Sequence, residues 1–317
     1  MIKNKTIAVV VPCYNESSQI SMVIESMPSF VDRIIIIDDS STDNTIEVAS
    51  KFLKSQEYNN ALVKLKKNII KKNKYNKADI LIQKRNEEEI KYFIDSKIIN
   101  DSSEKDRIII IKNKKNGGVG SAIARGYKWA KDYGVDCTAV MAGDGQMDPC
   151  ELKKICMGVV KNKIDYVKGN RLKHPSARFL MPKRRFIGNS VLSILTKIAS
   201  GYWRVSDTQT GYTAISLAAL KSIDLYKIYN SYGMPNDLLV KLNIIGAKIR
   251  EVPIKPIYNI GEKSKMKILK VIPRVSLLLI ISFFKRIWIK YFIKDFHPLF
   301  LLYHIALFLF LFWIPYL

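Results

Sequence analysis

A chain of 317 residues with 48% hydrophobic residues can bury a sizeable core, and its length predicts one large domain or two modest ones. Its four cysteines include no CxxC pair, which argues against a disulfide framework or a zinc site and favours a reducing compartment. The net charge of +24 suggests nucleic acid, but residues 171–204 carry eight Lys/Arg and no acid, and residues 261–294 carry nine Lys/Arg against one Glu. We therefore expect anions at two places and no nucleic-acid partner.

The first half of the chain alternates buried-strand patterns with polar loops and helical patterns. The expected strands span 7–11, 34–37, 108–111 and 137–141, and the helices after them begin near 17 or span 46–53, 123–132 and 149–161. This order predicts a mostly parallel α/β sheet with ligands at the carboxyl ends of the strands. A Lys/Asn-rich insertion, about residues 54–106, is expected to be partly helical and to lie at the surface.

The second half adds strands at 166–169, 214–216 and 249–254 and helices at 187–200 and 238–245, which completes a predicted catalytic domain over residues 1–260. Residues 261–296 carry two basic stripes, one from Lys263 to Arg274 and one from Arg286 to Lys294, interleaved with aromatic and aliphatic residues. Such stripes are typical of amphipathic helices in the headgroup region of an anionic membrane, and the alternative is packing on the protein's own core.

The C-terminal residues 298–317 contain no charged side chain. As a helix this stretch would be about 30 Å long, which matches the hydrocarbon thickness of a bilayer, so we predict a transmembrane helix over 297–317. The Lys/Arg excess before it predicts attachment to the cell membrane with the catalytic domain on the cytoplasmic face.

Two loops of the sheet are candidate ligand sites. After the fourth strand, Asp144 and Gln146 stand two residues apart on a loop of small residues, and such oxygen ligands suit Mg²⁺ or Mn²⁺ bridging a diphosphate. The same residues are compatible with a plain Asp-rich turn in which Asp148 caps the next helix. The glycine loop at 117–120 could present backbone N–H groups to an anion, although it fits neither a dinucleotide fingerprint nor a P-loop.

Taken together, the loops resemble the family-two inverting glycosyltransferases, and within them the polyprenyl-phosphate (dolichyl-phosphate) sugar synthases. The matching pieces, in chain order, are VVVPCYNES, IIIIDDSSTDNT, NGGVGSAIARGY, VMAGDGQMDP, VKGNR, TGYTAIS, YGMPNDLL and the SKM at 264–266. The resemblance implies a Rossmann-like glycosyltransferase A-type fold, a nucleotide-sugar donor and a divalent metal. It implies a metal site at Asp144 and Gln146, with Ala142 where the family carries an acid. The residues that it implies around the donor nucleotide are Pro12, Tyr14, Asn15, Glu16, Asp38, Asp39 and Asp144.

The chemistry of transfer requires the leaving diphosphate to be neutralised by a metal and by cationic side chains. The candidates for this role are Arg171, Arg184, Arg185 and Lys265. A sugar hydroxyl acceptor needs a general base, for which Asp237 is the nearest fit, whereas a lipid phosphate is already ionised and needs none. In that case Asp237 would orient the substrate.

The sequence therefore favours transfer of a hexose from a GDP-mannose or UDP-glucose type of donor to dolichyl or another polyprenyl phosphate, with inversion. Two alternatives stay open at this point. One is a membrane-bound transferase that acts on a sugar hydroxyl in polysaccharide synthesis. The other is a non-catalytic basic protein that binds a membrane or nucleic acid, which would show steeply salt-dependent nucleic-acid binding.

Overall fold

The computed structural model describes residues 1–61, 63–65, 67, 70–181, 183–258 and 268–313, with side chains except at 56, 178, 183–187 and 268–271. Within this part an eight-stranded sheet has the order β3-β4-β2-β1-β5-β7-β6-β8, and only β3 and β7 run antiparallel to their neighbours. The strands are β1 Ile7–Cys13, β2 Arg33–Asp38, β3 Ser96–Ile98, β4 Ile108–Asn113, β5 Cys137–Val140, β6 Tyr166–Asn170, β7 Thr213–Ser216 and β8 Ile249–Pro253.

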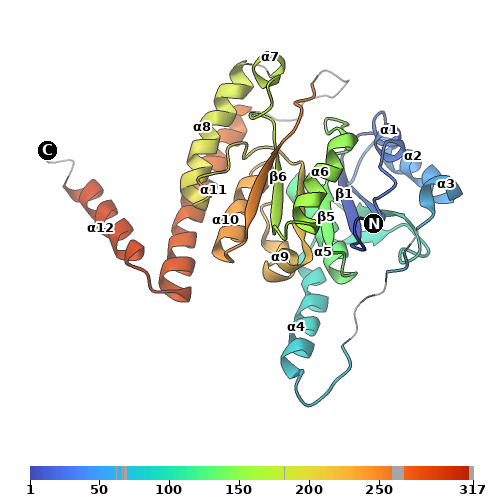
Figure 1. The fold of residues 1–317 in the computed structure, drawn as a ribbon, viewed down its shortest axis with the longest axis horizontal. Coiled ribbons are helices and arrows are strands. Elements are labelled where there is room, and N and C mark those ends of the chain that lie inside the picture. The colour runs from blue at the N-terminus through green and yellow to red at the C-terminus, as the bar shows by residue number, and fades with distance from the viewer. Residues whose placement is uncertain (62, 66, 68–69, 182, 259–267, 314–317) are drawn as a thin grey trace.

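Continuous runs of isoleucine explain the central strands, because both faces of a parallel sheet are buried. In β2, Ile34 and Ile36 join one hydrophobic cluster, while Ile35 and Ile37 join the cluster on the opposite face. The first cluster includes α1, α2 and α6, and the second includes α5, α9 and α10. The result is a sheet between two helical layers (Figure 1).

Most of the helices lie in the intervals between the strands, and α11 and α12 follow the last strand. They are α1 Ile20–Glu25, α2 Thr45–Lys51, α3 Gln56–Asn59, α4 Lys77–Glu88, α5 Val119–Asp132, α6 Pro149–Val160, α7 Ala177–Leu180, α8 Lys183–Ser200, α9 Leu217–Ser222, α10 Met234–Ile244, α11 Ile268–Trp288 and α12 Pro298–Phe312. Short helical turns are η1 Phe52–Lys54, η2 Glu89–Tyr92, η3 Leu225–Lys227 and η4 Ile289–Lys294, of which η4 is a π-helix.

Most of the expected strands and helices are present, with ends that differ by a few residues. The insertion contains α3, α4 and η2, as expected, and also the edge strand β3, which the sequence reading missed because three residues give no usable alternation. The short helices α7, α9 and η3 were also missed, because three to six residues are too few to show a helical repeat.

A third, smaller core joins α8, α10 and α11 beside the sheet. Its buried side chains are Ala199 on α8, Val240 on α10, and Val275 and Leu279 on α11. Pro273 lies inside α11 near its beginning, and the helix continues through it. The segment after the predicted catalytic domain is therefore packed against that domain through one face of α11.

The second basic stripe contacts the protein's own helices, which is the packing alternative to a headgroup-binding surface, although Lys294 itself is exposed. Arg286 is only 3% exposed and donates from Nε to the Ala199 carbonyl (2.8 Å) and from Nη2 to the Ile198 carbonyl (3.2 Å), both in the last turn of α8. Lys290 and Lys294 donate to carbonyls in the last turn of α10. The physical reason is that the last carbonyls of a helix lack intrahelical donors and attract cations.

Of the first basic stripe, the structure describes the side chain of Arg274 alone. Lys263 and Lys267 lie outside the described residues, and the side chain of Lys270 is not described. Arg274 is exposed.

The apolar C-terminal segment forms α12, which contacts α11 through the aromatic pair Trp288–Phe300 and η4 through Phe292–Phe300. Across the residues that the structure describes, no helix is both long and apolar enough to cross a membrane. With fifteen residues, α12 rises only about 22 Å. The described helix thus does not bear out the predicted span, and residues 314–317 lie outside the description.

Replacement of Arg286 by Ala should destabilise the packing of α11 on α8. We expect a loss of about 2 kcal/mol in the free energy of unfolding, because buried carbonyls lose a charged donor. Urea denaturation of the full chain in mild detergent, followed by circular dichroism, measures the change. The matched control is Lys285→Ala at the exposed neighbouring position, and equal midpoints for the two variants would contradict the capping role.

Candidate active site

The loops that follow the parallel strands meet at one edge of the sheet. Strands β1, β2, β4, β5 and β6 all end at this edge, and β7 begins there. Backbone hydrogen bonds join the loops: Asp39 N–H donates to the Cys13 carbonyl (2.9 Å), and Gly143 N–H donates to the Pro12 carbonyl (3.2 Å). A Cβ on Gly143 would lie 2.7 Å from Cys13 Sγ, so this approach requires glycine.

The loops after β1 and β2 form a single hydrogen-bonded unit. Asn15 has a positive φ of 53°, and its N–H donates to Ser41 Oγ (2.9 Å) while its Oδ1 accepts from Thr42 N–H (2.8 Å). Glu16 N–H donates to Thr45 Oγ1 (2.9 Å). The predicted nucleotide-binding residues Asn15 and Glu16 are thereby brought beside the Asp38–Asp39 loop. Of the other predicted residues, Pro12 is buried and Tyr14 is 36% exposed.

Asp39 connects β2 to the glycine loop. The residue is 3% exposed, and its carboxylate accepts from Asn113 Nδ2 (2.8 Å), Gly117 N–H (2.9 Å) and Gly118 N–H (2.7 Å). Asp38 is fully buried and accepts from Ser41 N–H at 3.2 Å. Burial raises the pKa of Asp38, and the adjacent Asp39 adds to the rise, against the hydrogen bonds from Ser41.

The first turn of α5 is held by the chain's own backbone. Gly120 N–H donates to the Asn230 carbonyl at 2.8 Å, and Ser121 N–H donates to the same oxygen at 3.3 Å. A Cβ on Gly120 would lie 2.0 Å from the Tyr229 carbonyl oxygen, which explains the glycine. The proposal that this loop presents free N–H groups to an anion is wrong for Gly117, Gly118, Gly120 and Ser121, because protein oxygens accept from all four.

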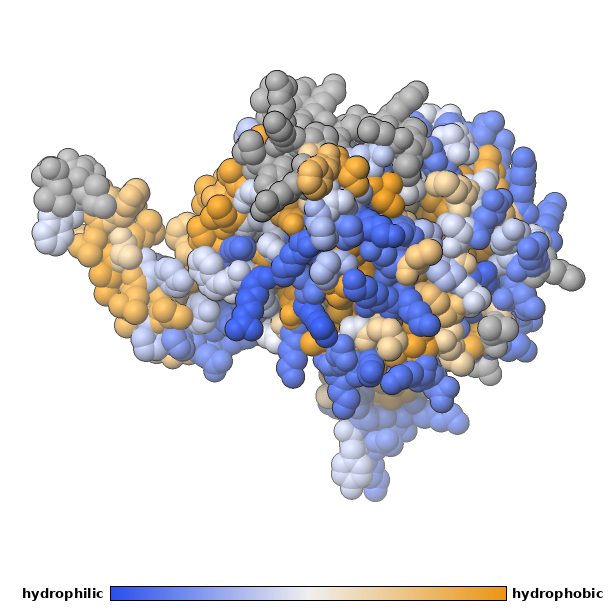
Figure 2. Space-filling view, turned by 45° about the horizontal axis from the view of Figure 1, so that its top comes forward, coloured by the Kyte–Doolittle hydropathy of each residue, from blue (hydrophilic) through white to orange (hydrophobic). Residues whose placement is uncertain are grey.

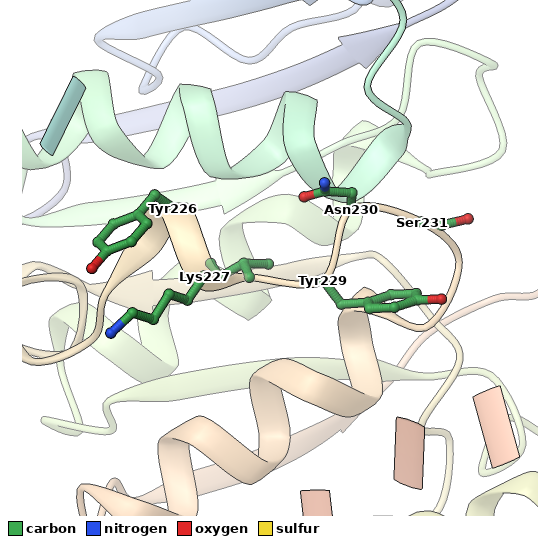
Figure 3. Close-up of a pocket in the computed structure, with 6 residues that line it drawn as sticks. Tyr226, Lys227, Tyr229, Asn230 and Ser231 are labelled. Carbon is green, nitrogen blue, oxygen red and sulfur yellow. The ribbon is translucent and has the colours of Figure 1, made fainter. Parts of the chain in front are cut away.

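A shallow hollow lies where this contact is made. Its volume is about 420 Å³, and it is lined by Tyr226, Lys227, Ile228, Tyr229, Asn230 and Ser231. Figure 3 shows that Tyr226 and Lys227 point away from Tyr229 and Ser231. Since the side chains diverge, we assign this hollow no ligand.

The loop after β5 has the compact turn that its small residues predict. Gln146 N–H donates to Asp144 Oδ1 at 3.0 Å, with Gly145 at a φ of +74°. Asp148 caps α6 by accepting from Cys150 N–H at 2.9 Å. The described residues contain no group of three or more His, Cys, Asp or Glu side chains that could hold a metal. One carboxylate and one amide oxygen are what this loop offers to a cation.

Arg171 is held beside the site by Asp207, a partner that sequence reasoning missed. Arg171 Nε and Nη2 donate to the two carboxylate oxygens of Asp207 at 2.8 and 3.0 Å, and the Arg171 side chain stays 23% exposed. Burial works to raise the pKa of Asp207, but the charges of Arg171 and Lys168 outweigh it and the pKa is lowered. Glu251 accepts from the N–H groups of Ser206 and Asp207 and fixes this loop. No local motif joins residues this far apart in the sequence.

Asp237 is buried at the start of α10 and is already paired. Its carboxylate forms an ion pair with Lys241 one turn later and accepts from Tyr229 N–H at 2.8 Å. Burial lowers the pKa of Lys241, while the charge of Asp237 opposes this. The predicted base therefore also anchors the segment whose next carbonyl, that of Asn230, holds α5.

The remaining predicted cations cannot be assigned from the described side chains. Arg184 and Arg185 lie in the first turn of α8, and their side chains are not described. Lys265 lies outside the described residues.

A family model described as glycosyl transferase family 2 matches residues 8–78 and 87–224, which is more than half of the chain. The chain belongs to glycosyl transferase family 2. The family resemblance seen in the sequence is thereby confirmed, and the protein is a glycosyltransferase rather than a non-catalytic basic protein.

Curated relatives include lipid-phosphate sugar transferases. A UDP-N-acetylglucosamine–dolichyl-phosphate N-acetylglucosaminyltransferase of Methanococcus voltae is 30% identical over 257 residues, covering 81% of this chain and 87% of that protein. An undecaprenyl-phosphate mannosyltransferase of Micrococcus luteus is 26% identical over 166 residues, covering 52% of this chain and 67% of that protein.

Among solved structures, glucosyl-3-phosphoglycerate synthase of Mycobacterium tuberculosis, in complex with Mn²⁺, UDP and glucosyl-3-phosphoglycerate, has a similar fold. The TM-score is 0.54 at 17% identity, over 89% of this chain and 80% of that chain. This similarity supports the A-type glycosyltransferase fold that the sequence predicted.

The buried Lys168 should make the free energy of unfolding depend on pH. It is fully buried on β6 and donates to the Thr210 carbonyl, and burial lowers its pKa from about 10.5 to about 8. Between these values the unfolded chain holds a proton that the folded chain has lost, so this group makes stability rise with pH from about 8 to 10.5, by at most about 3 kcal/mol. Unfolding of the wild type and of Lys168→Met, compared at pH 7.5 and 10, measures the rise. Parallel pH dependences would contradict it.

Proposed function

We propose that the protein transfers a sugar from a nucleotide diphosphate donor to the phosphate of a polyprenyl lipid, with inversion at the anomeric carbon. The observation that carries this proposal is the state of Asp237. Both carboxylate oxygens of Asp237 contact Lys241 Nζ, and Oδ2 also accepts from Tyr229 N–H, so the carboxylate is engaged by the protein's own donors at the place where a hydroxyl acceptor would need a base. A phosphate monoester is ionised near neutral pH and needs no base.

The donor nucleotide would lie against the unit formed by the loops after β1 and β2. Asp38 and Asp39 would face the base and ribose, together with Pro12, Tyr14, Asn15 and Glu16. Asp144 and Gln146 would hold a divalent metal, with the donor diphosphate supplying the other oxygens, and that metal would neutralise the leaving group. The oxygen donors of this loop suit Mg²⁺ or Mn²⁺, and Ala142 leaves the protein with few ligands of its own.

Arg171 is the described cation best suited to meet phosphate oxygens. Its bidentate pairing with Asp207 fixes the guanidinium plane and leaves N–H donors unused, and part of the side chain is exposed. Arg184, Arg185 and Lys265 remain proposals for the same role, because they belong to the two basic segments of the sequence.

A membrane surface is the proposed location of the lipid acceptor. The outward faces of α8 and α11 expose aliphatic side chains, among them Ile194 (58%), Leu277 (59%) and Ile280 (56%). Figure 2 shows that hydrophobic residues also cover much of the α12 arm. Apolar helix faces that continue over three helices are typical of contact with lipid.

We place UDP-N-acetylglucosamine first among candidate donors, ahead of UDP-glucose and GDP-mannose. The support is the 30% identical relative that is named for this donor. The acceptor class rests on the same relative and on the undecaprenyl-phosphate mannosyltransferase.

The direct test incubates membranes that contain the protein with polyprenyl phosphate and each labelled donor, with and without Mn²⁺. We expect label in the lipid fraction with one donor. For Asp144→Ala we expect the rate of labelling to fall by about 10²-fold or more, because the metal that neutralises the leaving diphosphate would lose its carboxylate ligand from the protein. Asp101→Ala, at an exposed loop position, is the control. Absence of lipid label with every donor, or full activity of Asp144→Ala, would refute the proposal.

Asp237→Asn separates the two acceptor classes. The amide keeps an acceptor for Tyr229 N–H but cannot serve as a base, so transfer to polyprenyl phosphate should fall by less than about tenfold. A fall of about 10³-fold would instead indicate general-base catalysis on a hydroxyl acceptor. The rate of lipid labelling at saturating donor and acceptor measures the difference.

A further inference from the structure

The insertion between α2 and β4 is more than a surface decoration. The family model leaves residues 79–86 unmatched, which lie within α4, and α4 has no buried residue. Figure 1 shows α4 projecting from the body of the domain. Its contacts with the domain are made by its last turns and by the residues that follow it, and they reach two different places.

The first contact is a buried ion pair whose carboxylate also accepts a backbone hydrogen bond. Glu89, 5% exposed, accepts from Leu225 N–H at 3.0 Å and pairs with Lys131 of α5 at 2.9 Å. A carboxylate shared by a backbone N–H and a nearly buried ammonium fixes the position of η3 relative to α5.

The second set of contacts with η3 surrounds the first. Arg85 pairs with Asp224 at 2.9 Å, and the rings of Tyr92 and Tyr226 stack with centroids 4.8 Å apart. Residues before and after Glu89 in the insertion thus also contact η3 and the residue that precedes it.

The other place is the glycine loop. Ile94 packs directly on Gly117, since a Cβ on that glycine would lie 2.1 Å from Ile94 Cδ1. Asp95 accepts from Lys114 N–H through its carbonyl (2.8 Å) and pairs with Lys114 Nζ through its carboxylate (3.2 Å). The insertion therefore covers the backbone that binds Asp39.

These two places are parts of one hydrogen-bonded unit. Gly117 and Gly118 N–H groups hold Asp39, and the adjoining turn of α5 donates to the carbonyl of Asn230, three residues after η3 ends. An element that fixes both η3 and the glycine loop therefore also fixes the carboxylate of Asp39, which the glycine loop binds.

We propose that residues 85–95 of the insertion are a positioning element of the donor site, with Glu89 and Ile94 as its two principal contacts. This inference rests on the proposed function, because it assumes that Asp39 faces the donor nucleotide. The residues act through the glycine loop and do not touch the donor. Their loss affects the binding of the donor in its ground state more than the chemical step.

Binding of UDP and of GDP to the full chain, measured by calorimetry without acceptor, tests the inference. Ile94→Ala and Glu89→Ala should each weaken binding of the preferred nucleotide by about tenfold, and raise the donor KM similarly while kcat changes by less than about twofold. Ile94→Leu, which keeps the volume, should bind within about twofold of the wild type. Leu81→Ala, at a 58% exposed position on α4, is the matched control.

Glu89→Gln provides a milder variant if the alanine variants do not fold. It keeps an acceptor for Leu225 N–H and loses only the charge opposite Lys131, so binding should weaken by a smaller factor than in Glu89→Ala. Variants that melt at lower temperature but bind the nucleotide like the wild type overturn the inference and leave the proposed function intact. A wild type that binds neither nucleotide overturns the donor assignment and the inference with it.

Discussion

The carboxylate of Asp39 is the contact on which the candidate site depends. It accepts three hydrogen bonds, from one side-chain amide and two backbone N–H groups, and so ties the end of β2 to the loop after β4 and to the entry of α5. A buried carboxylate is stable only when such donors replace water. The glycine loop thus supports an acid of the protein, which explains why its sequence fits neither an established dinucleotide nor an established phosphate-binding motif.

Much of the fold could be predicted because its causes are local. The isoleucine runs of β2 and β4 report strands that are buried on both faces, and Asp148 followed by proline reports the beginning of α6. The order of these elements was sufficient to expect a mostly parallel sheet. The order of the loops also predicted which of them meet in the structure, because the carboxyl ends of parallel strands share one edge.

Beyond the short elements, the features that could not be predicted depend on pairs that are distant in the sequence. Arg171 was read as a cation for phosphate, yet its orientation comes from Asp207, which no periodicity or motif connects to it. The second basic stripe was read as a membrane contact, because the same spacing would serve either role. Arg286, Lys290 and Lys294 instead neutralise the carbonyl ends of α8 and α10, which a sequence cannot reveal before the packing of the helices is known.

The same packing connects the C-terminal helices to the candidate site. The helices α8 and α10 begin near the edge of the sheet, with Asp237 in the first turn of α10, and they end under the cations of α11 and η4. The cations of α11 and η4 are therefore connected through α10 to its first turn, where Asp237 lies. Asp237 in turn accepts from Tyr229 N–H, and the carbonyl of the next residue, Asn230, accepts from the first turn of α5. The start of α10, the glycine loop and Asp39 are thus connected through hydrogen bonds, and Asp237 contributes to that connection whether or not it ever accepts a proton.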